Sequence, residues 1–147
     1  MNWAPETKFL AGLRMTGLSL LDPAGRSRHR MGIGLVLRAP KTQMSWEVDL
    51  FAAEGDAKRA MIATVGGIAY SDHLGEGKRR FLNPYTGLRL GYGQLDGSNF
   101  VGAVEVGLEL FKHERAILDV NVRGTGFFGK GGGDYALVTA AGLSVAF

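Results

Sequence analysis

Hydrophobic and polar residues alternate with a period of two along almost the whole chain, in stretches separated by turn-forming residues. The stretches are about 10–14 residues long, whereas an ordinary strand has about 5–6 and a tilted membrane-crossing strand about 9–11. The pattern therefore predicts an all-β fold of long antiparallel strands. We expect eight strands, over residues 8–20, 29–38, 44–53, 59–70, 84–93, 100–111, 116–127 and 134–147.

Charged residues inside these strands share a face with Gly, Ser and Thr, and the large aliphatic residues occupy the other face. Five cations balance five anions on the charged face, and every cation is Arg, whose planar guanidinium can satisfy several carboxylates in a confined space. This set favours a packed polar interior with aliphatic rows facing lipid over a soluble barrel, whose exposed charges would be mixed and rich in Lys. The interior charges are predicted to be Arg14, Arg30, Arg38, Arg89, Arg123, Glu47, Asp49, Glu105, Glu109 and Asp119.

Composition agrees with a membrane barrel. Gly accounts for 23 of 147 residues, and the mean hydropathy of +0.03 is what alternating apolar and polar residues produce. No apolar run is long enough for a transmembrane helix. The chain has no Cys, three scattered His and a net charge of +3, so we expect no disulfide, metal site, cofactor or nucleic-acid partner.

Aromatic residues cluster near both ends of the expected strands, as in the two interfacial girdles of a transmembrane barrel. One girdle, on the side of the chain termini, is predicted to contain Phe9, Tyr70, Tyr85, Phe111 and Phe147. The other is predicted to contain Tyr92, Phe100, Phe127, Phe128 and Tyr135.

The two halves of the chain show weak echoes at an offset of 75 residues. "AGLRMTG" and "TGLRLGY" place Arg14 over Arg89, and "ATVGGIAY" and "VTAAGLSV" place Thr64 over Thr139. A duplicated four-strand unit joined by residues 71–83 would produce these echoes, and so would a generic strand pattern.

Together these features resemble the small eight-stranded outer-membrane β-barrels of Gram-negative bacteria, the OmpA/OmpX-like group, over almost the whole chain. The most specific element is the final "AGLSVAF", which supplies Gly142, Val145 and Phe147 at the spacings of that group's terminal strand. Ala140 stands where a polar residue is common, and Val145 where an aromatic one is preferred.

The resemblance implies a single up-and-down transmembrane barrel over residues 1–147, in the bacterial outer membrane, with residues 1–7 as an N-terminal tail. The terminal strand would be the signal read by the barrel assembly machinery. The start "MNWAPETK" has no apolar signal core, so an exported form would have lost its signal peptide.

In that topology both termini and the longest connection, residues 71–83, lie in the periplasm. This connection either links two halves or docks a periplasmic partner. The outward loops are short, which weakens an adhesin or receptor function. Basic residues at the outward ends, Arg26, Arg28, Lys58 and Arg59, are candidates to contact lipopolysaccharide phosphates; the alternative is a solvated basic loop.

Some barrels of this size are lipid A acyl hydrolases or acyltransferases. A hydrolase needs Ser and His in hydrogen-bond reach and a carboxylate to orient the His, and the nearest set is Ser19, His29 and Asp22. Ten charged groups should plug a lumen of eight strands, which argues against a channel. We therefore expect a non-enzymatic envelope structural element or the membrane anchor of a larger assembly; the alternatives are a lipid A-modifying enzyme and a small channel.

Overall fold

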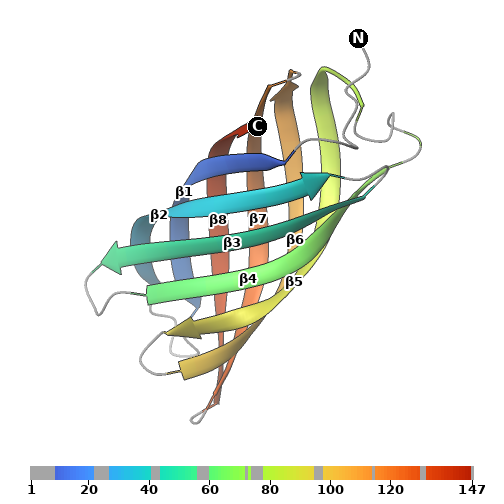
Figure 1. Cartoon of the computed structure of the whole chain (residues 1–147). Coiled ribbons are helices and arrows are strands. Elements are labelled where there is room, and N and C mark those ends of the chain that lie inside the picture. The colour runs from blue at the N-terminus through green and yellow to red at the C-terminus, as the bar shows by residue number, and fades with distance from the viewer. Residues whose placement is uncertain are drawn as a thin grey trace.

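The chain folds into a closed, eight-stranded antiparallel barrel in which each strand pairs with the next along the sequence (Figure 1). The computed structural model describes residues 9–21, 27–40, 44–55, 60–71, 73, 78–94, 98–113, 115–129 and 132–146. The strands are β1 (Leu10–Leu21), β2 (Ser27–Pro40), β3 (Met44–Gly55), β4 (Ala60–Tyr70), β5 (Phe81–Gln94), β6 (Ser98–Lys112), β7 (Ala116–Gly129) and β8 (Gly132–Ala146). The prediction of eight strands and an all-β barrel is confirmed, and no strand end differs by more than about three residues.

The barrel closes because β8 pairs with the whole length of β1, from Leu10 opposite Ala146 to Leu21 opposite Tyr135. Closure leaves no sheet edge with unpaired backbone groups. No helix in the described part of the chain is long and apolar enough to cross a membrane.

The two faces of the strands are inverted relative to a soluble protein. Large apolar side chains cover the outside, among them Ile33, Leu90 and Phe100, each about 70% exposed. Arg38, Arg89 and other charged side chains lie buried inside. A contiguous apolar exterior around a charged interior is stable only when the exterior faces lipid, as in transmembrane barrels.

We call the end of the barrel where the chain begins and finishes the terminal end, and the other the far end. The connections at the far end are residues 22–26, 56–59, 95–97 and 130–131, and those at the terminal end are 41–43, 71–80 and 113–115. Charged side chains fill the middle of the lumen. A buried cluster that we call the apolar plug fills its far end and comprises Leu18, Phe51, Ala53, Ala60, Ile62, Val101, Phe127, Ala136 and Val138.

Glycine makes room for the long Arg side chains. A Cβ atom on Gly142 would lie 2.5 Å from Cγ of Arg14, and one on Gly66 would lie 2.7 Å from Cγ of Arg89. Each Arg therefore lies across the backbone of a neighbouring strand where a side chain is missing. The high glycine content is in part a packing requirement of the charged interior.

Residues that the 75-residue offset aligns do not always face the same side of the barrel wall. Arg14 and Arg89 both face the lumen. Thr64 also faces the lumen and donates a hydrogen bond to Asp49, but Thr139 is exposed on the outside. An alignment of β4 with β8 at this offset thus exchanges the two faces of the strand, so the geometry gives no support to a duplicated four-strand unit.

The predicted girdles are correct only in part. Phe9 and four far-end aromatics, Tyr92, Phe100, Phe128 and Tyr135, are exposed on the outside. Three predicted members are buried in the lumen instead: Tyr70, Tyr85 and Phe127. Their place in the alternation decides this, because Tyr85 has the parity of Arg89 and Phe127 that of Arg123. Trp46 and Phe81, which are not among the predicted girdle residues, are also exposed near the terminal end.

Candidate functional site

The lumen contains a network of ion pairs, and Glu47 on β3 lies at its centre. Its carboxylate accepts a hydrogen bond from Nε of Arg38 on β2 at 2.6 Å. Nη2 of Arg14 on β1 lies 3.4 Å from Oε2, and Arg89 on β5 contacts the same oxygen. One carboxylate therefore draws guanidinium groups from three strands.

Asp49, two residues further along β3, is the second hub. Its Oδ2 atom lies 2.6 Å from Nη1 of Arg123, 3.3 Å from Nη1 of Arg89 and 3.4 Å from Nη1 of Arg14. The hydroxyl of Thr64 donates to Oδ1 at 2.5 Å. Arg89 thus contacts both hubs of β3 from β5.

Carboxylates on β6 and β7 complete the network. Glu105 accepts from Nε of Arg89 at 2.9 Å and from Nε of Arg123 at 3.2 Å. Asp119 lies 3.3 Å from Nη2 of Arg14 and accepts a hydrogen bond from the hydroxyl of Tyr85 at 2.7 Å. These links join β5, β6 and β7 to the β1 side of the barrel.

Glu109 anchors the terminal-end side of the network. It accepts hydrogen bonds from Nη1 of Arg38 at 3.0 Å, from the hydroxyl of Tyr70 at 3.1 Å and from Nζ of Lys112 at 3.2 Å. The Lys112 ammonium also lies 4.8 Å from the centre of the Tyr70 ring, a cation–π distance.

Lys112 is a member of the interior that the alternation alone does not predict. The register of β6 against β7 shifts between Glu109 and Phe111. A bulge of this kind inserts one extra residue and changes the parity beyond it, so Lys112 faces the lumen three residues after Glu109. The spacing of Lys112 from Glu109 is visible in the sequence, but the bulge that turns Lys112 inward is not.

Nine of the ten predicted interior charges form this one network, and Arg30 does not join it. Arg30 is buried, but neither its Nη1 nor its Nη2 atom has a hydrogen-bond partner. The network fills the lumen: opposed charges within 3.6 Å of one another occupy the section that an open channel would need.

The candidate hydrolytic residues lie elsewhere, on the outside near the far end. Ser19 on β1 and His29 on β2 are opposite each other in the register, and the Ser19 hydroxyl lies 2.9 Å from Nδ1 of His29. Asp22, the third predicted member, lies outside the described residues. Over the described ranges, no group of three or more His, Cys, Asp or Glu side chains is placed to hold a metal ion.

The remaining predicted residues are described only in part. Three of the basic residues fall outside the described residues: Arg26, Lys58 and Arg59. For Arg28 only the backbone is described, in β2 opposite Leu20. In the terminal strand, Gly142 faces the lumen and Val145 is half-exposed on the outside. Phe147 lies outside the described residues.

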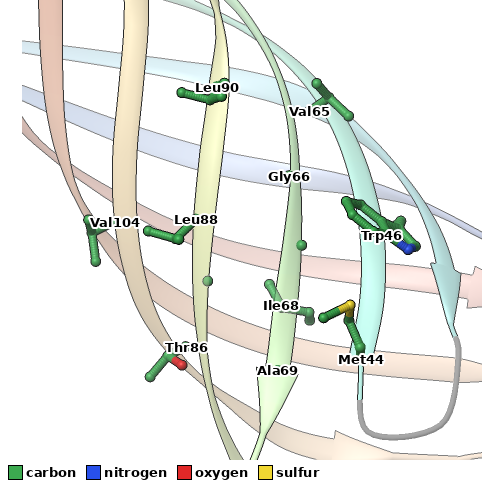
Figure 2. A pocket seen from close by; sticks show the side chains of 12 residues that line it. Met44, Trp46, Val65, Gly66, Ile68, Ala69, Thr86, Leu88, Leu90 and Val104 are labelled. Carbon is green, nitrogen blue, oxygen red and sulfur yellow. The ribbon is translucent and has the colours of Figure 1, made fainter.

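A shallow groove of about 600 Å³ runs along the outside of β3–β6 (Figure 2). Gly66, Gly67 and Gly87 form its floor, and Trp46, Leu88 and Val104 are among the apolar side chains beside it. Because the groove opens on the lipid-facing side and presents almost only carbon, it suits acyl chains rather than a polar substrate.

Fold and interior together define the class: the chain is a small, closed, eight-stranded β-barrel with an apolar exterior and a salt-bridged interior, which is the fold of the small outer-membrane barrels. Among solved structures it is similar to Neisserial surface protein A (NspA), with a TM-score of 0.77, 15% identity, and coverage of 95% of this chain and 97% of NspA. It is also similar to Ail, the attachment invasion locus protein of Yersinia pestis (TM-score 0.67, 12% identity, 97% and 99% coverage). A third is the N-terminal β-barrel domain of Pseudomonas aeruginosa OprF (TM-score 0.58, 12% identity, 94% and 97% coverage). Neither a family model nor a curated protein matches the sequence.

Proposed function

We propose that this barrel is a non-enzymatic component of the outer membrane, acting as an envelope structural element or as the membrane anchor of a larger assembly. The observation that carries the proposal is the filled lumen. Glu47, Asp49 and their guanidinium partners span it in its middle section, and the apolar plug occupies the far end. The described side chains leave no continuous water-filled channel through this interior. Function would therefore reside on the outer surface and at the two ends.

Planar-bilayer conductance tests the occluded interior. Purified, refolded protein should give no steady open-channel current, because moving an ion through the lumen requires breaking several buried ion pairs. Steady currents from the unmodified protein would overturn the proposal and favour the small channel.

An exposed surface at the terminal end supports the anchor role; we call Arg79, Arg80, Phe81 and Leu82 the 79–82 surface. All four residues are exposed. The Arg80 guanidinium lies 5.6 Å from the centre of the Phe81 ring. Asn83 holds the turn by bonding both the N–H and the carbonyl of Arg79. Fixed cations beside exposed apolar side chains suit a periplasmic protein with an acidic, partly apolar face.

Site-specific photocrosslinking in native membranes tests this partner. A crosslinker at Leu82 should give a discrete adduct that disappears in R79E/R80E, whereas a crosslinker at lipid-facing Leu35 should not give it. Identical products from both positions would remove the anchor role and leave the structural role standing.

A contact with lipopolysaccharide belongs to the same proposal. Arg26, Lys58 and Arg59 belong to the far-end connections in the sequence and Arg28 to the start of β2, and guanidinium groups bind phosphate well. Replacing all four with Gln should lower the amount of lipopolysaccharide that copurifies with the barrel. An unchanged amount would indicate a solvated basic loop.

One observation favours a second candidate, a lipid A-modifying acyl hydrolase or acyltransferase. The Ser19 hydroxyl is within hydrogen-bond distance of His29, 2.9 Å from Nδ1, the relation that a nucleophile and its base require. Lipid A from cells expressing H29A should keep the acyl pattern of the wild type if the barrel is not an enzyme. A change in that pattern by mass spectrometry, reproduced in S19A, would establish the enzyme instead.

A further inference from the structure

Arg30 is a buried cation that no residue of the described barrel neutralises. It lies near the far end of β2, opposite Leu18 of the apolar plug on one side and Gly55 on the other. Its exposed fraction is 2%. Both terminal nitrogens of its guanidinium lack a hydrogen-bond partner.

The four other interior Arg residues show how unusual this is. Arg14, Arg38, Arg89 and Arg123 each lie within ion-pair distance of at least two carboxylates. A buried charge without a partner is strongly unfavourable, because it has lost its hydration and gained nothing in return. Arg30 therefore has an unmet requirement for an anion.

The charge count of the lumen points the same way. Among the residues whose side chains the structure describes, the buried anions are five: Glu47, Asp49, Glu105, Glu109 and Asp119. The buried cations are six: Arg14, Arg30, Arg38, Arg89, Arg123 and Lys112. All five carboxylates already pair with cations other than Arg30, so the described interior carries one positive charge in excess, at Arg30.

We propose that Arg30 anchors an oxyanion-binding site in the far end of the lumen, and that its ligand is a phosphate or a phosphate monoester. The two free Nη groups form a fork that can bind two oxygens of one phosphate at once. The neighbouring plug is apolar, so within the described part of the chain no plug residue competes with the bound anion for Arg30. Since Arg30 lies three residues inside the end of β2, the phosphate could be free in solution or carried on a lipid headgroup.

Binding is tested with refolded protein in uncharged detergent micelles free of phosphate. Titration of inorganic phosphate, followed by calorimetry, should be saturable with one site. Bound phosphate should also raise the urea midpoint of unfolding, because it binds only the folded state. In R30M the affinity should fall at least about tenfold, and the midpoint should no longer respond to phosphate.

The stability of the variants in the absence of phosphate is a second readout, and here R30M is not expected to be impaired. In phosphate-free micelles R30M should be at least as stable as the wild type, since the substitution removes an uncompensated buried charge. R38M is the contrasting interior variant, because it strips a partner from Glu47 and Glu109, and it should be less stable. R115M, which removes an exposed Arg at the terminal end, controls for net charge and should bind phosphate like the wild type.

The source of the phosphate is separated by a parallel titration with short-chain phosphatidic acid in the same micelles. Binding of inorganic phosphate identifies a free-anion site, and binding of the lipid alone identifies a headgroup site; Arg30 dependence in either supports the proposal. Absence of binding in both arms, or equal binding by R30M, would overturn it. Native circular dichroism and a gel shift between boiled and unboiled samples verify that each variant has folded.

Discussion

Arg14 and Asp119 are 105 residues apart in the sequence, yet Nη2 of Arg14 lies 3.3 Å from Oδ2 of Asp119. They lie on β1 and β7, and β8 runs between these strands. Gly142 of β8 is the residue directly opposite both, pairing with Arg14 on one side and Asp119 on the other. The ion pair therefore passes over a position that has no side chain. The glycine of the proposed assembly signal has a packing role of its own.

Substitution of Gly142 by Ala should destabilise the refolded barrel. The new methyl group would lie 2.5 Å from Cγ of Arg14, and overpacking of this kind costs about 1–3 kcal/mol. Gly124 is the matched control, because it is exposed on the outside and a Cβ there would have nothing within 4 Å. Urea unfolding in detergent micelles should show a lower midpoint for G142A than for G124A. Equal midpoints would mean that Arg14 can rearrange freely.

Removal of the charge at Glu47 should be more damaging. E47Q leaves Arg14, Arg38 and Arg89 without their shared partner, and breaking a buried ion pair by removing one partner costs about 3–5 kcal/mol. E54Q, on the same strand but exposed, should cost far less. The free energy of unfolding from urea titrations compares the two, and a difference below about 1 kcal/mol would show that the lumen contains enough water to rehydrate the guanidinium groups.

The hydroxyl of Tyr85 should contribute to stability as part of the interior and not of a girdle. It donates to Asp119 at 2.7 Å and accepts from Nδ2 of Asn121 at 3.2 Å. Y85F leaves two buried polar groups without that partner, at a cost of about 1–3 kcal/mol. Y92F, which alters an exposed aromatic on the same strand, should change the unfolding midpoint little. If Y92F lowered the unfolding midpoint more than Y85F did, the result would contradict an interior role for the Tyr85 hydroxyl.

Deletion of Phe147 should separate assembly in cells from intrinsic stability. If the terminal strand is read by the assembly machinery, the deletion should lower the heat-modifiable fraction in outer membranes. The same variant should refold in micelles like the wild type, because every residue of β1 pairs with a β8 residue that the deletion leaves in place. Equal losses in both settings would assign Phe147 a structural role instead.

Alternation alone predicts most of this structure because a strand offers only two directions for a side chain. It places Leu35 and Val104 outside and Glu47 and Arg89 inside, as the barrel has them. Tyr70, Tyr85 and Phe127 follow parity and not proximity to a strand end, because each lies near an end and yet faces the lumen. Parity is the stronger signal, since it is fixed by the pleat.

Other features depend on relations between strands that are distant in sequence. Lys112 faces the lumen because of a bulge, and no residue type at that position predicts a bulge. The isolation of Arg30 depends on which carboxylates the tilt of the strands brings level with it across the lumen. Neither the alternation nor the equal count of Arg and carboxylates carries that information.

The three cations around Glu47 have a consequence for how the barrel forms. Arg38 comes from the adjacent strand of the same hairpin, but Arg14 and Arg89 come from β1 and β5. The β2–β3 hairpin alone can satisfy only the Arg38 contact, so in the apolar phase it would leave Glu47 without its other two cations. We therefore expect intermediates to remain at the water interface until most strands are in place, so that insertion and closure occur in one concerted step.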